Sequence, residues 1–247
     1  MTRLDDNRLL KLNETSDKLQ MTTIGLRHTI DFLSVQPEMW ESPTCNEMRR
    51  IVEGYIRSQG LLDTFACLFH RATTVTCARD TTGKLRAFSL CEMANIRNEG
   101  ICASERKSLQ ATYRSATFVR SDSQRTGLGT SLTEAYIDRF RPAVFCFSTA
   151  SIAWLRKIQG VLSLRDYSCF PNNGQMVPLT VLQVANEVLR VTGRNDNMPT
   201  ERLIRQGLYL PHGEDAQFAS SRVSIWPPAS EDALMLVCLD GREIKIK

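Results

Sequence analysis

The first half of the chain begins with alternating residues and continues with a stretch of helical period. Residues 23–33 alternate between apolar and polar side chains, which predicts a first strand. Apolar side chains then recur at helical spacing through residues 42–60, which predicts an amphipathic helix. Ser42 or Thr44 is suited to cap the start of this helix, and Gly60 is placed to end it.

The middle of the chain alternates between strand and helix patterns. Residues 73–94 predict a hairpin around a Thr-Thr-Gly turn, and residues 109–119, rich in threonine and aromatic side chains, predict a further strand. The period becomes helical at 128–140, and residues 143–149 form a short apolar run typical of a strand buried on both faces. Residues 151–160 predict a short helix that ends at its glycine.

The last quarter of the chain has a looser pattern. Residues 179–193 predict an amphipathic helix and residues 199–206 a shorter one. Residues 222–226 predict a strand, and Asp240-Gly241 lies between two alternating runs within residues 233–247, which predicts a terminal hairpin.

These elements divide the chain into three parts. We expect an N-terminal arm at 1–20, an α/β core at 21–170, and a C-terminal extension at 171–247 that packs on the same sheet. The chain has 247 residues, 42% of them hydrophobic and 23% charged, so it can bury a core without cross-links. This composition excludes a disordered tail, a collagen and a coiled coil.

Charge and hydropathy narrow the class of protein further. The net charge of +4 is spread along the chain, whereas nucleic-acid binders concentrate basic residues on one face, so no nucleic-acid partner is expected. No stretch reaches the about 18 apolar residues of a membrane span, and the start lacks the apolar run of a signal peptide. We therefore expect a cytoplasmic protein without a membrane partner.

The cysteines do not form a metal or disulfide pattern. The chain has 8 cysteines and 3 histidines, but no two cysteines have the spacing of a zinc motif. Several lie inside apolar runs, where a free cysteine behaves as a small buried hydrophobe. We expect reduced structural thiols and no metal site.

A glycine-containing segment between a strand and a helix is the most informative part of the chain. After residues 109–119 come a short polar loop, Gln124, Gly127 and Gly129, and then the helical period of 128–140. The first turn of a helix leaves backbone N–H groups without helical partners, and the helix dipole adds partial positive charge there. Glycines allow a ligand to approach the backbone closely, so the segment is suited to bind a pyrophosphate.

Two other phosphate-binding motifs do not fit. A P-loop requires a lysine after its last glycine, and no lysine follows Gly129. A dinucleotide-binding fingerprint requires a third glycine where Leu132 stands. An ordinary strand-to-helix turn stays as the alternative without a ligand.

With this order of elements, the segment resembles the acyl-CoA-binding motif [Q/R]-x-x-G-x-[G/A] of the GNAT N-acetyltransferase superfamily. The resemblance covers about residues 22–170. It implies a three-layer α/β/α fold with a mixed, mostly antiparallel, twisted sheet, here with a C-terminal helix and hairpin extension. It also implies that the strands at 110–119 and 143–149 diverge and that the thioester lies between them.

The resemblance assigns acetyl-CoA as the acyl donor and gives this segment three tasks. Backbone N–H groups of 126–130 hold the pyrophosphate, the backbone of 118–120 pairs with the pantetheine arm, and an N–H near Val119 or Arg120 binds the thioester oxygen. Arg125 and Arg120 are candidates for phosphate contacts, with solvated surface as the alternative. The cofactor-binding residues expected on this basis are Phe118, Val119, Arg120, Gln124, Arg125, Thr126, Gly127, Leu128, Gly129 and Thr130.

The catalytic residues depart from the family pattern. The family often has a glutamate base on the central strand, but residues 109–119 contain no Glu or Asp, and the nearest candidate is Glu92. The tyrosine that often serves as the acid is absent from residues 151–160. Tyr167 is the expected substitute and Tyr113 another candidate, with core packing as the alternative for both.

The resemblance implies an N-acetyltransferase in which an amine attacks the bound acyl-CoA directly. The acceptor is an amine of a small molecule or of a protein, and its identity should depend on residues 34–70 and 171–247. A homodimer is compatible with this expectation. The missing catalytic residues leave one alternative open, a catalytically inactive CoA-binding or protein-interaction module of the same fold.

Overall fold

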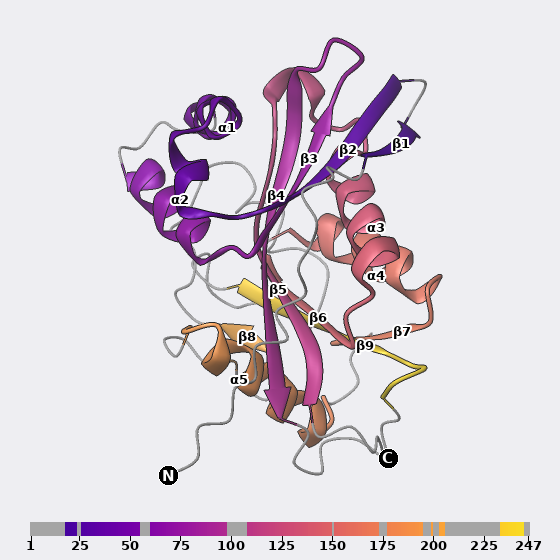
Figure 1. Cartoon of the computed structure of the whole chain (residues 1–247). Coiled ribbons are helices and arrows are strands. Elements are labelled where there is room, and N and C mark those ends of the chain that lie inside the picture. The colour runs from indigo at the N-terminus through magenta and orange to yellow at the C-terminus, as the bar shows by residue number, and fades with distance from the viewer. Residues whose placement is uncertain are drawn as a thin grey trace, which may run out of the picture.

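A mixed sheet of nine strands organises the chain, which we describe from a computed structural model (Figure 1). The structure describes residues 18–23, 26–54, 60–97, 108–149, 151–172, 177–194, 199, 203–205 and 233–244. The strands are β1 Lys18–Thr23, β2 Leu26–Ser34, β3 Thr74–Arg79, β4 Leu85–Arg97, β5 Ser108–Val119, β6 Val144–Thr149, β7 Tyr167–Phe170, β8 Ile204–Arg205 and β9 Ala233–Asp240. The α-helices are α1 Pro43–Glu53, α2 Gly60–Arg71, α3 Leu128–Phe140, α4 Ile152–Ser163 and α5 Leu179–Val191, with short 3₁₀ turns at Pro37–Glu41 and Ser121–Ser123.

Strand pairing in the sheet is antiparallel except at one place. The order is β1-β2-β3-β4-β5-β6-β9-β7, and β8 also pairs with β9. Only β5 and β6 run parallel, and α3 forms the crossover between them. The expected fold class, a mixed and mostly antiparallel sheet with helices on its faces, is confirmed.

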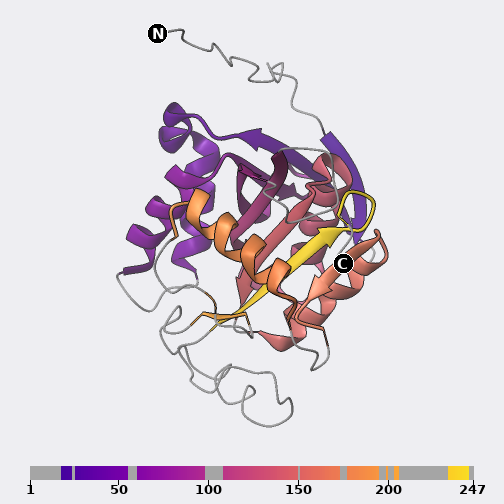
Figure 2. The same cartoon turned by 90° about the horizontal axis from the view of Figure 1, so that it is seen from below.

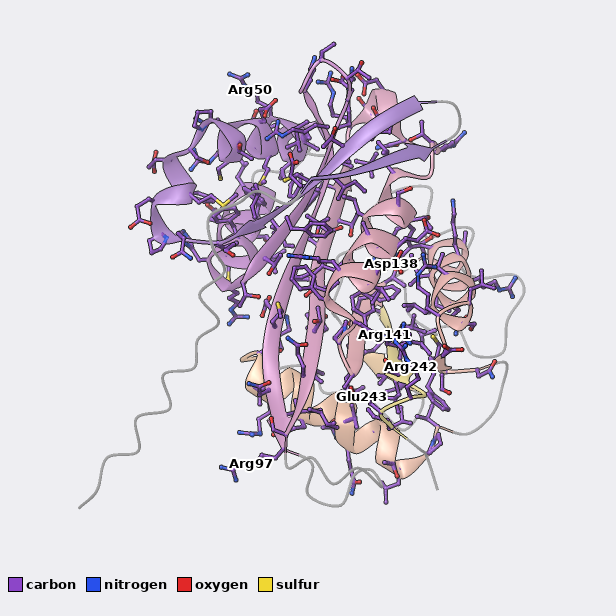
Figure 3. The ribbon with its side chains drawn as sticks, turned by 45° about the vertical axis from the view of Figure 1, so that its right-hand side comes forward. Arg50, Arg97, Asp138, Arg141, Arg242 and Glu243 are labelled. Carbon is purple, nitrogen blue, oxygen red and sulfur yellow. The ribbon has the colours of Figure 1, made fainter. Side chains whose placement is uncertain are left out.

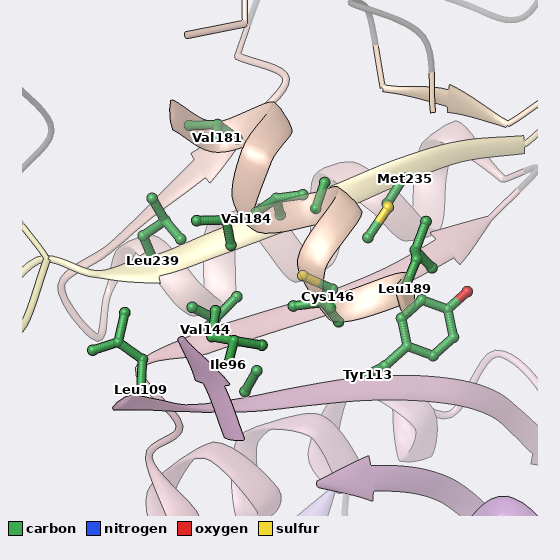
Figure 4. Packing of buried hydrophobic residues seen from close by; sticks show 14 of the residues in the cluster. Ile96, Leu109, Tyr113, Val144, Cys146, Val181, Val184, Leu189, Met235 and Leu239 are labelled. Atoms are coloured by element: carbon green, nitrogen blue, oxygen red, sulfur yellow. The ribbon is translucent and has the colours of Figure 1, made fainter. Parts of the chain in front are cut away.

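The helices cover both faces of the sheet (Figures 1 and 2). Helices α3 and α4 pack on one face, which we call the α3/α4 face. Helices α1, α2 and α5 pack on the other, the α1/α5 face. The alternation along β6 shows why both faces are apolar, because Val144 and Cys146 contact α5 (Figure 4) while Phe145 and Phe147 contact α3 and α4.

A β-bulge in β5 separates two registers of the sheet. Leu90 pairs with Ala116 and Cys91 pairs with Arg114, so Ser115 is the extra residue. A bulge of this kind bends the strand and shifts the alternation of its side chains by one position. Tyr113 therefore lies on the α1/α5 face with Ala116, although the two are three positions apart and a regular strand would place them on opposite faces.

Two expected helix ends differ from the structure. Ser42 caps α1 as expected, because its Oγ accepts the Cys45 N–H at 3.1 Å. However, α1 ends at Glu53, and Gly60 begins α2 rather than ending the first helix. Helix α4 likewise continues past Gly160 to Ser163, because a glycine can stay in a helix interior at a cost of only about 1 kcal/mol.

The C-terminal region adds a helix and a central strand to the sheet. Helix α5 lies where the sequence predicts it, but the helix expected at 199–206 is wrong, since Ile204–Arg205 pairs with β9 as β8. The expected hairpin also differs from the structure. Residues 241–243 form a turn that closes on Asp240, and Arg141 and Arg242 lie beside it (Figure 3). Residues 222–226 and 245–247 lie outside the described residues.

Thiol labelling of the native protein should separate the described cysteines into two groups. Cys67 is exposed, whereas Cys77 and Cys91 are buried and burial raises the pKa of each thiol to about 12. Because the thiolate is the reactive form, we expect a maleimide to modify Cys67 first and the buried cysteines only after denaturation. Peptide mass spectrometry over a labelling time course measures this. Equal rates at Cys67 and Cys77 would contradict the described packing.

Candidate functional site

A cavity of about 530 Å³ lies where β5 and β6 diverge, beside the start of α3. Its volume is within the roughly 300–1,000 Å³ that is usual for small-molecule sites. The lining residues come from β5, the loop before α3, the first turn of α3, the end of β6 and the start of α4. They are Arg114, Ser115, Ala116, Thr117, Val119, Ser123, Gln124, Arg125, Gly127, Leu128, Gly129, Thr130, Phe147, Ser148, Thr149, Ser151, Ala153, Trp154 and Lys157.

The divergence of the two strands begins at the bulge. The parallel register joins Ala111–Arg114 to Val144–Phe147, and β5 continues from Ser115 to Val119 beyond this paired segment. Arg120 donates its N–H to the Arg86 carbonyl at 2.9 Å. In an antiparallel pair these bonds alternate, so the backbone N–H groups of Thr117 and Val119 are directed to the side of β5 away from β4, where the cavity lies.

The start of α3 presents backbone donors and a buried hydroxyl to the cavity. Gly127 caps the helix with a φ of 89°, a left-handed conformation that glycine adopts without steric cost. Leu128 and Gly129 follow as the first helical residues, where N–H groups have no helical carbonyl to reach. Thr130 Oγ1 is buried without a hydrogen-bond partner among the described residues. An anion at this place would satisfy these donors.

Gly129 allows α3 and α4 to approach each other closely. A Cβ at position 129 would lie 2.8 Å from the Trp154 ring and 3.5 Å from a Thr117 methyl carbon. The glycine is therefore required both for the packing of Trp154 and for access to the helix start.

The described part of the lining carries positive charge. Arg114, Arg125 and Lys157 belong to it, and none of its described residues is Asp, Glu, His, Cys or Tyr. Arg114 is 4% exposed and lies at the end where β5 and β6 join, whereas Lys157 is exposed on α4. The cavity is therefore suited electrostatically to an anionic ligand.

The structure brings most of the expected cofactor residues together, but not all of them. Phe118 stacks on Phe88 in the core under α1 and α2, and Arg120 forms an ion pair with Asp122 at 3.0 Å. Thr126 donates its hydroxyl to the Ser123 carbonyl at 2.6 Å, and none of these three expected residues lines the cavity. Those that line it are Val119, Gln124, Arg125, Gly127, Leu128, Gly129 and Thr130.

Glu92 lies in the interior, on the α1/α5 face. It is 4% exposed and makes a bidentate ion pair with Arg194, which follows α5. Burial alone would lower the pKa of the Arg194 guanidinium, but the bonds to Glu92 outweigh it and raise that pKa. The Arg194 Cζ also lies 4.4 Å from the ring centroid of Tyr113, the cross-strand partner of Glu92.

Tyr113 connects this buried pair to the cavity. Its hydroxyl donates to Ser148 Oγ at 3.1 Å, and Ser148 lines the cavity. Ala116 and Ser148 belong to the α1/α5 face, while Thr117 and Phe147 belong to the α3/α4 face. The lining therefore includes residues from both faces, so the cavity crosses the sheet where the strands separate.

Tyr167 has the contacts of a packed tyrosine. It lies on β7, donates its hydroxyl to the Pro142 carbonyl at 2.7 Å, and is not part of the cavity lining. Burial raises the pKa of its phenol above the usual value. Its assignment as the acid stays a prediction, which the activity of Tyr167→Phe would check.

Apart from Val119, the site residues expected from the sequence include none of the lining residues that come from β5, β6 and α4. Arg114 was hidden in a strand pattern, because no local signal shows that a bulge will turn it toward the cavity. The sequence contains only a weak indication that Lys157 lines the cavity. Helix α4 follows β6 closely, and Lys157 lies in the second turn of α4. Trp154 both lines the cavity and lies close to Gly129 of α3.

The described residues hold no group of three or more His, Cys, Asp or Glu side chains that could bind a metal ion. Among the same residues, no helix has both the length and the hydropathy to span a bilayer.

Comparisons with known proteins find similarity in structure but not in sequence. No protein-family model and no curated protein matches the sequence. The ribosomal-protein-S18-alanine N-acetyltransferase of Escherichia coli is 15% identical with a TM-score of 0.45, over 85% of this chain and 94% of that one. Naa20 of Chaetomium thermophilum, solved with a bisubstrate analogue, is 15% identical with a TM-score of 0.40, over 86% and 87%. A GNAT family N-acetyltransferase (YhbS) of E. coli, solved with CoA, is 17% identical with a TM-score of 0.38, over 56% and 71%.

Proposed function

We propose that this protein belongs to the GNAT superfamily, binds an acyl-CoA, and transfers its acyl group, most simply acetyl, to an amine. The observation that carries the proposal is the cavity between the diverging strands β5 and β6, which continues to the open backbone donors at the start of α3. A long anionic ligand can place its phosphates at that helix start and its uncharged arm along β5.

The residues present fit the acyl donor. Leu128 and Gly129 supply N–H groups, and the Thr130 hydroxyl a further donor, for the pyrophosphate. Arg125 and Lys157 add positive charge to the lining. The N–H groups of Thr117 and Val119 are directed to the cavity, where they can bond the arm of the donor or the thioester oxygen that gains charge in the transition state.

The acceptor would reach the thioester from the α1/α5 face. Ala116 and Ser148 line the cavity from that face, and Glu92 lies there beside Tyr113. We infer that the amine enters on this side, and that Glu92 assists its deprotonation through Tyr113 and Ser148. Catalysis would then rest mainly on positioning and on the backbone donors of β5.

The second candidate is a CoA-binding or protein-interaction module without catalytic activity. One observation favours it. Among the residues that the structure describes, the cavity lining contains no carboxylate, imidazole, thiol or phenol. CoA binding without product formation across a panel of amines and peptides would support this candidate over the enzyme.

Reversing the charge of Lys157 should weaken CoA binding, and reversing its neighbour should not. Lys157 and Arg156 are both exposed on α4, but only Lys157 lines the cavity. We expect Lys157→Glu to raise the Kd for CoA about tenfold, which corresponds to about 1.4 kcal/mol, and the matched control Arg156→Glu to change it little. Isothermal titration calorimetry measures both.

A thermal-shift titration with CoA and acetyl-CoA decides whether the proposal stands. A ligand at about 100 times its Kd should stabilise the wild type by about 2.7 kcal/mol. If neither ligand binds, the glycine segment is an ordinary strand-to-helix turn and the proposed function fails.

A further inference from the structure

A buried arginine lies at the closed end of the cavity. Arg114 directly precedes the bulge residue Ser115 in β5 and pairs with Phe147 in the last step of the parallel register. It is 4% exposed, and its Nη1 donates to Thr133 Oγ1 at 2.5 Å. Its Cζ lies 4.1 Å from the Phe147 ring centroid and 5.1 Å from that of Trp154. These contacts hold the guanidinium in one position.

The charge of Arg114 is fixed and poorly screened. A guanidinium stays protonated at any pH at which the protein is folded. Its effect on a neighbouring anion is larger in a low-dielectric interior than in water. None of the described lining residues is acidic, so the end of the cavity at Arg114 favours negative charge on a bound ligand.

The direction of the ligand follows from the two ends of the cavity. The α3 start is the phosphate end, and β5 runs along the lining from Val119 to Arg114, about 17 Å at roughly 3.3 Å per residue. An acyl-CoA whose arm follows β5 therefore brings its sulfur toward Arg114. The acyl group continues toward Ser148 and the α1/α5 face, away from the guanidinium.

We propose that the Arg114 guanidinium stabilises the departing CoA thiolate, so that the thiolate leaves without a proton donor. The inference rests on the proposed function. The amine nitrogen forms the new C–N bond at the thioester carbon, and the C–S bond breaks with its electron pair going to sulfur. The amine proton leaves on the α1/α5 side along the route through Ser148 and Tyr113 that Glu92 assists. CoA leaves as a thiolate whose charge Arg114 balances without changing its own protonation.

This role for Arg114 explains how the reaction can proceed without a proton donor in the cavity lining. None of the described lining residues carries a phenol, imidazole, thiol or carboxyl group that could protonate the sulfur. A nearby cation lowers the pKa of a thiol and so raises the fraction of thiolate near neutral pH. Arg114 would touch the reacting sulfur and so act as a catalytic residue.

The test is to measure the thiol pKa of bound CoA. The ultraviolet absorbance of the thiolate is recorded during a pH titration with protein in excess. We expect the wild type to lower this pKa by about one unit relative to free CoA, a tenfold higher thiolate-to-thiol ratio at a given pH. Arg114→Met should abolish the shift and Arg114→Lys should keep part of it. The matched control Arg156→Met removes an exposed cation of α4 that does not line the cavity, and it should keep the shift.

Binding of dethio-CoA, which lacks the sulfur, separates the two proposals. If the wild type binds CoA and dethio-CoA but leaves the thiol pKa unchanged, the role of Arg114 is wrong while the CoA site stands. If it binds neither, both proposals fail. If folded Arg114→Met keeps the full shift, the assignment to Arg114 is overturned. Should Arg114→Met fail to fold, by circular dichroism, the wild-type measurement and Arg114→Lys decide the question.

Discussion

Gly129→Glu should weaken CoA binding by raising the Kd at least a hundredfold. This corresponds to a loss of about 2.7 kcal/mol of binding free energy. The Cβ would lie 2.8 Å from the Trp154 ring, so α3, α4 or the indole must shift. The carboxylate would also compete with the phosphates for the N–H groups at the helix start and for the cations of the lining. Calorimetric titration of the folded variant with CoA and acetyl-CoA measures the loss.

Two further variants separate charge and crowding in this result. Gly160→Glu is the matched control, because a Cβ at Gly160 meets no atom within 4 Å and that residue is not part of the lining. Gly129→Ala tests crowding alone, and adding Trp154→Ala should restore part of the binding by making room. Wild-type affinity in folded Gly129→Glu would show that the phosphates bind elsewhere.

Arg194→Met should lower the free energy of unfolding by about 3–5 kcal/mol, the second large effect that we expect. Arg194 is 9% exposed and its bidentate partner Glu92 is 4% exposed, so the substitution leaves a carboxylate buried without its counter-charge. The contact with the Tyr113 ring is lost as well. Urea denaturation followed by circular dichroism measures the change.

The double variant Glu92→Gln/Arg194→Met tests this explanation and separates stability from catalysis. We expect it to be more stable than Arg194→Met alone, because both charges have been removed from the interior. If it folds and binds acetyl-CoA but forms no product, Glu92 or the pair acts in catalysis. If Arg194→Met costs less than about 1 kcal/mol, Glu92 is either solvated or neutral in the folded protein.

Local signals in the sequence were sufficient for most elements and for the phosphate end of the site. The helix start after Gln124 could be predicted because glycines, a preceding strand and a helical period all lie within one short segment. Helix α5 and the hairpin β3–β4 have equally strong periodic patterns. In each case the residues that determine the structure are neighbours along the chain.

Features that depend on distant partners could not be predicted in this way. The bulge at Ser115 decides which β5 side chains face the cavity, and it is set by the pairing with β4. The contact between Glu92 and Arg194 joins residues far apart in the chain. Residues 199–206 have a helical apolar pattern, but Ile204–Arg205 within them forms a strand paired with β9, so tertiary context overrides local preference there.

The position of β9 has a consequence for how the protein is made. All its residues are buried, and it lies between β6 on one side and β7 and β8 on the other. Ribosomes synthesise β5, α3 and β6 well before β9, so a nascent chain has the cavity strands in place while the edge of β6 is still unpaired. Exposed strand edges promote association with other chains. A chaperone that binds extended segments would therefore act on this protein in the interval between the synthesis of β6 and that of β9.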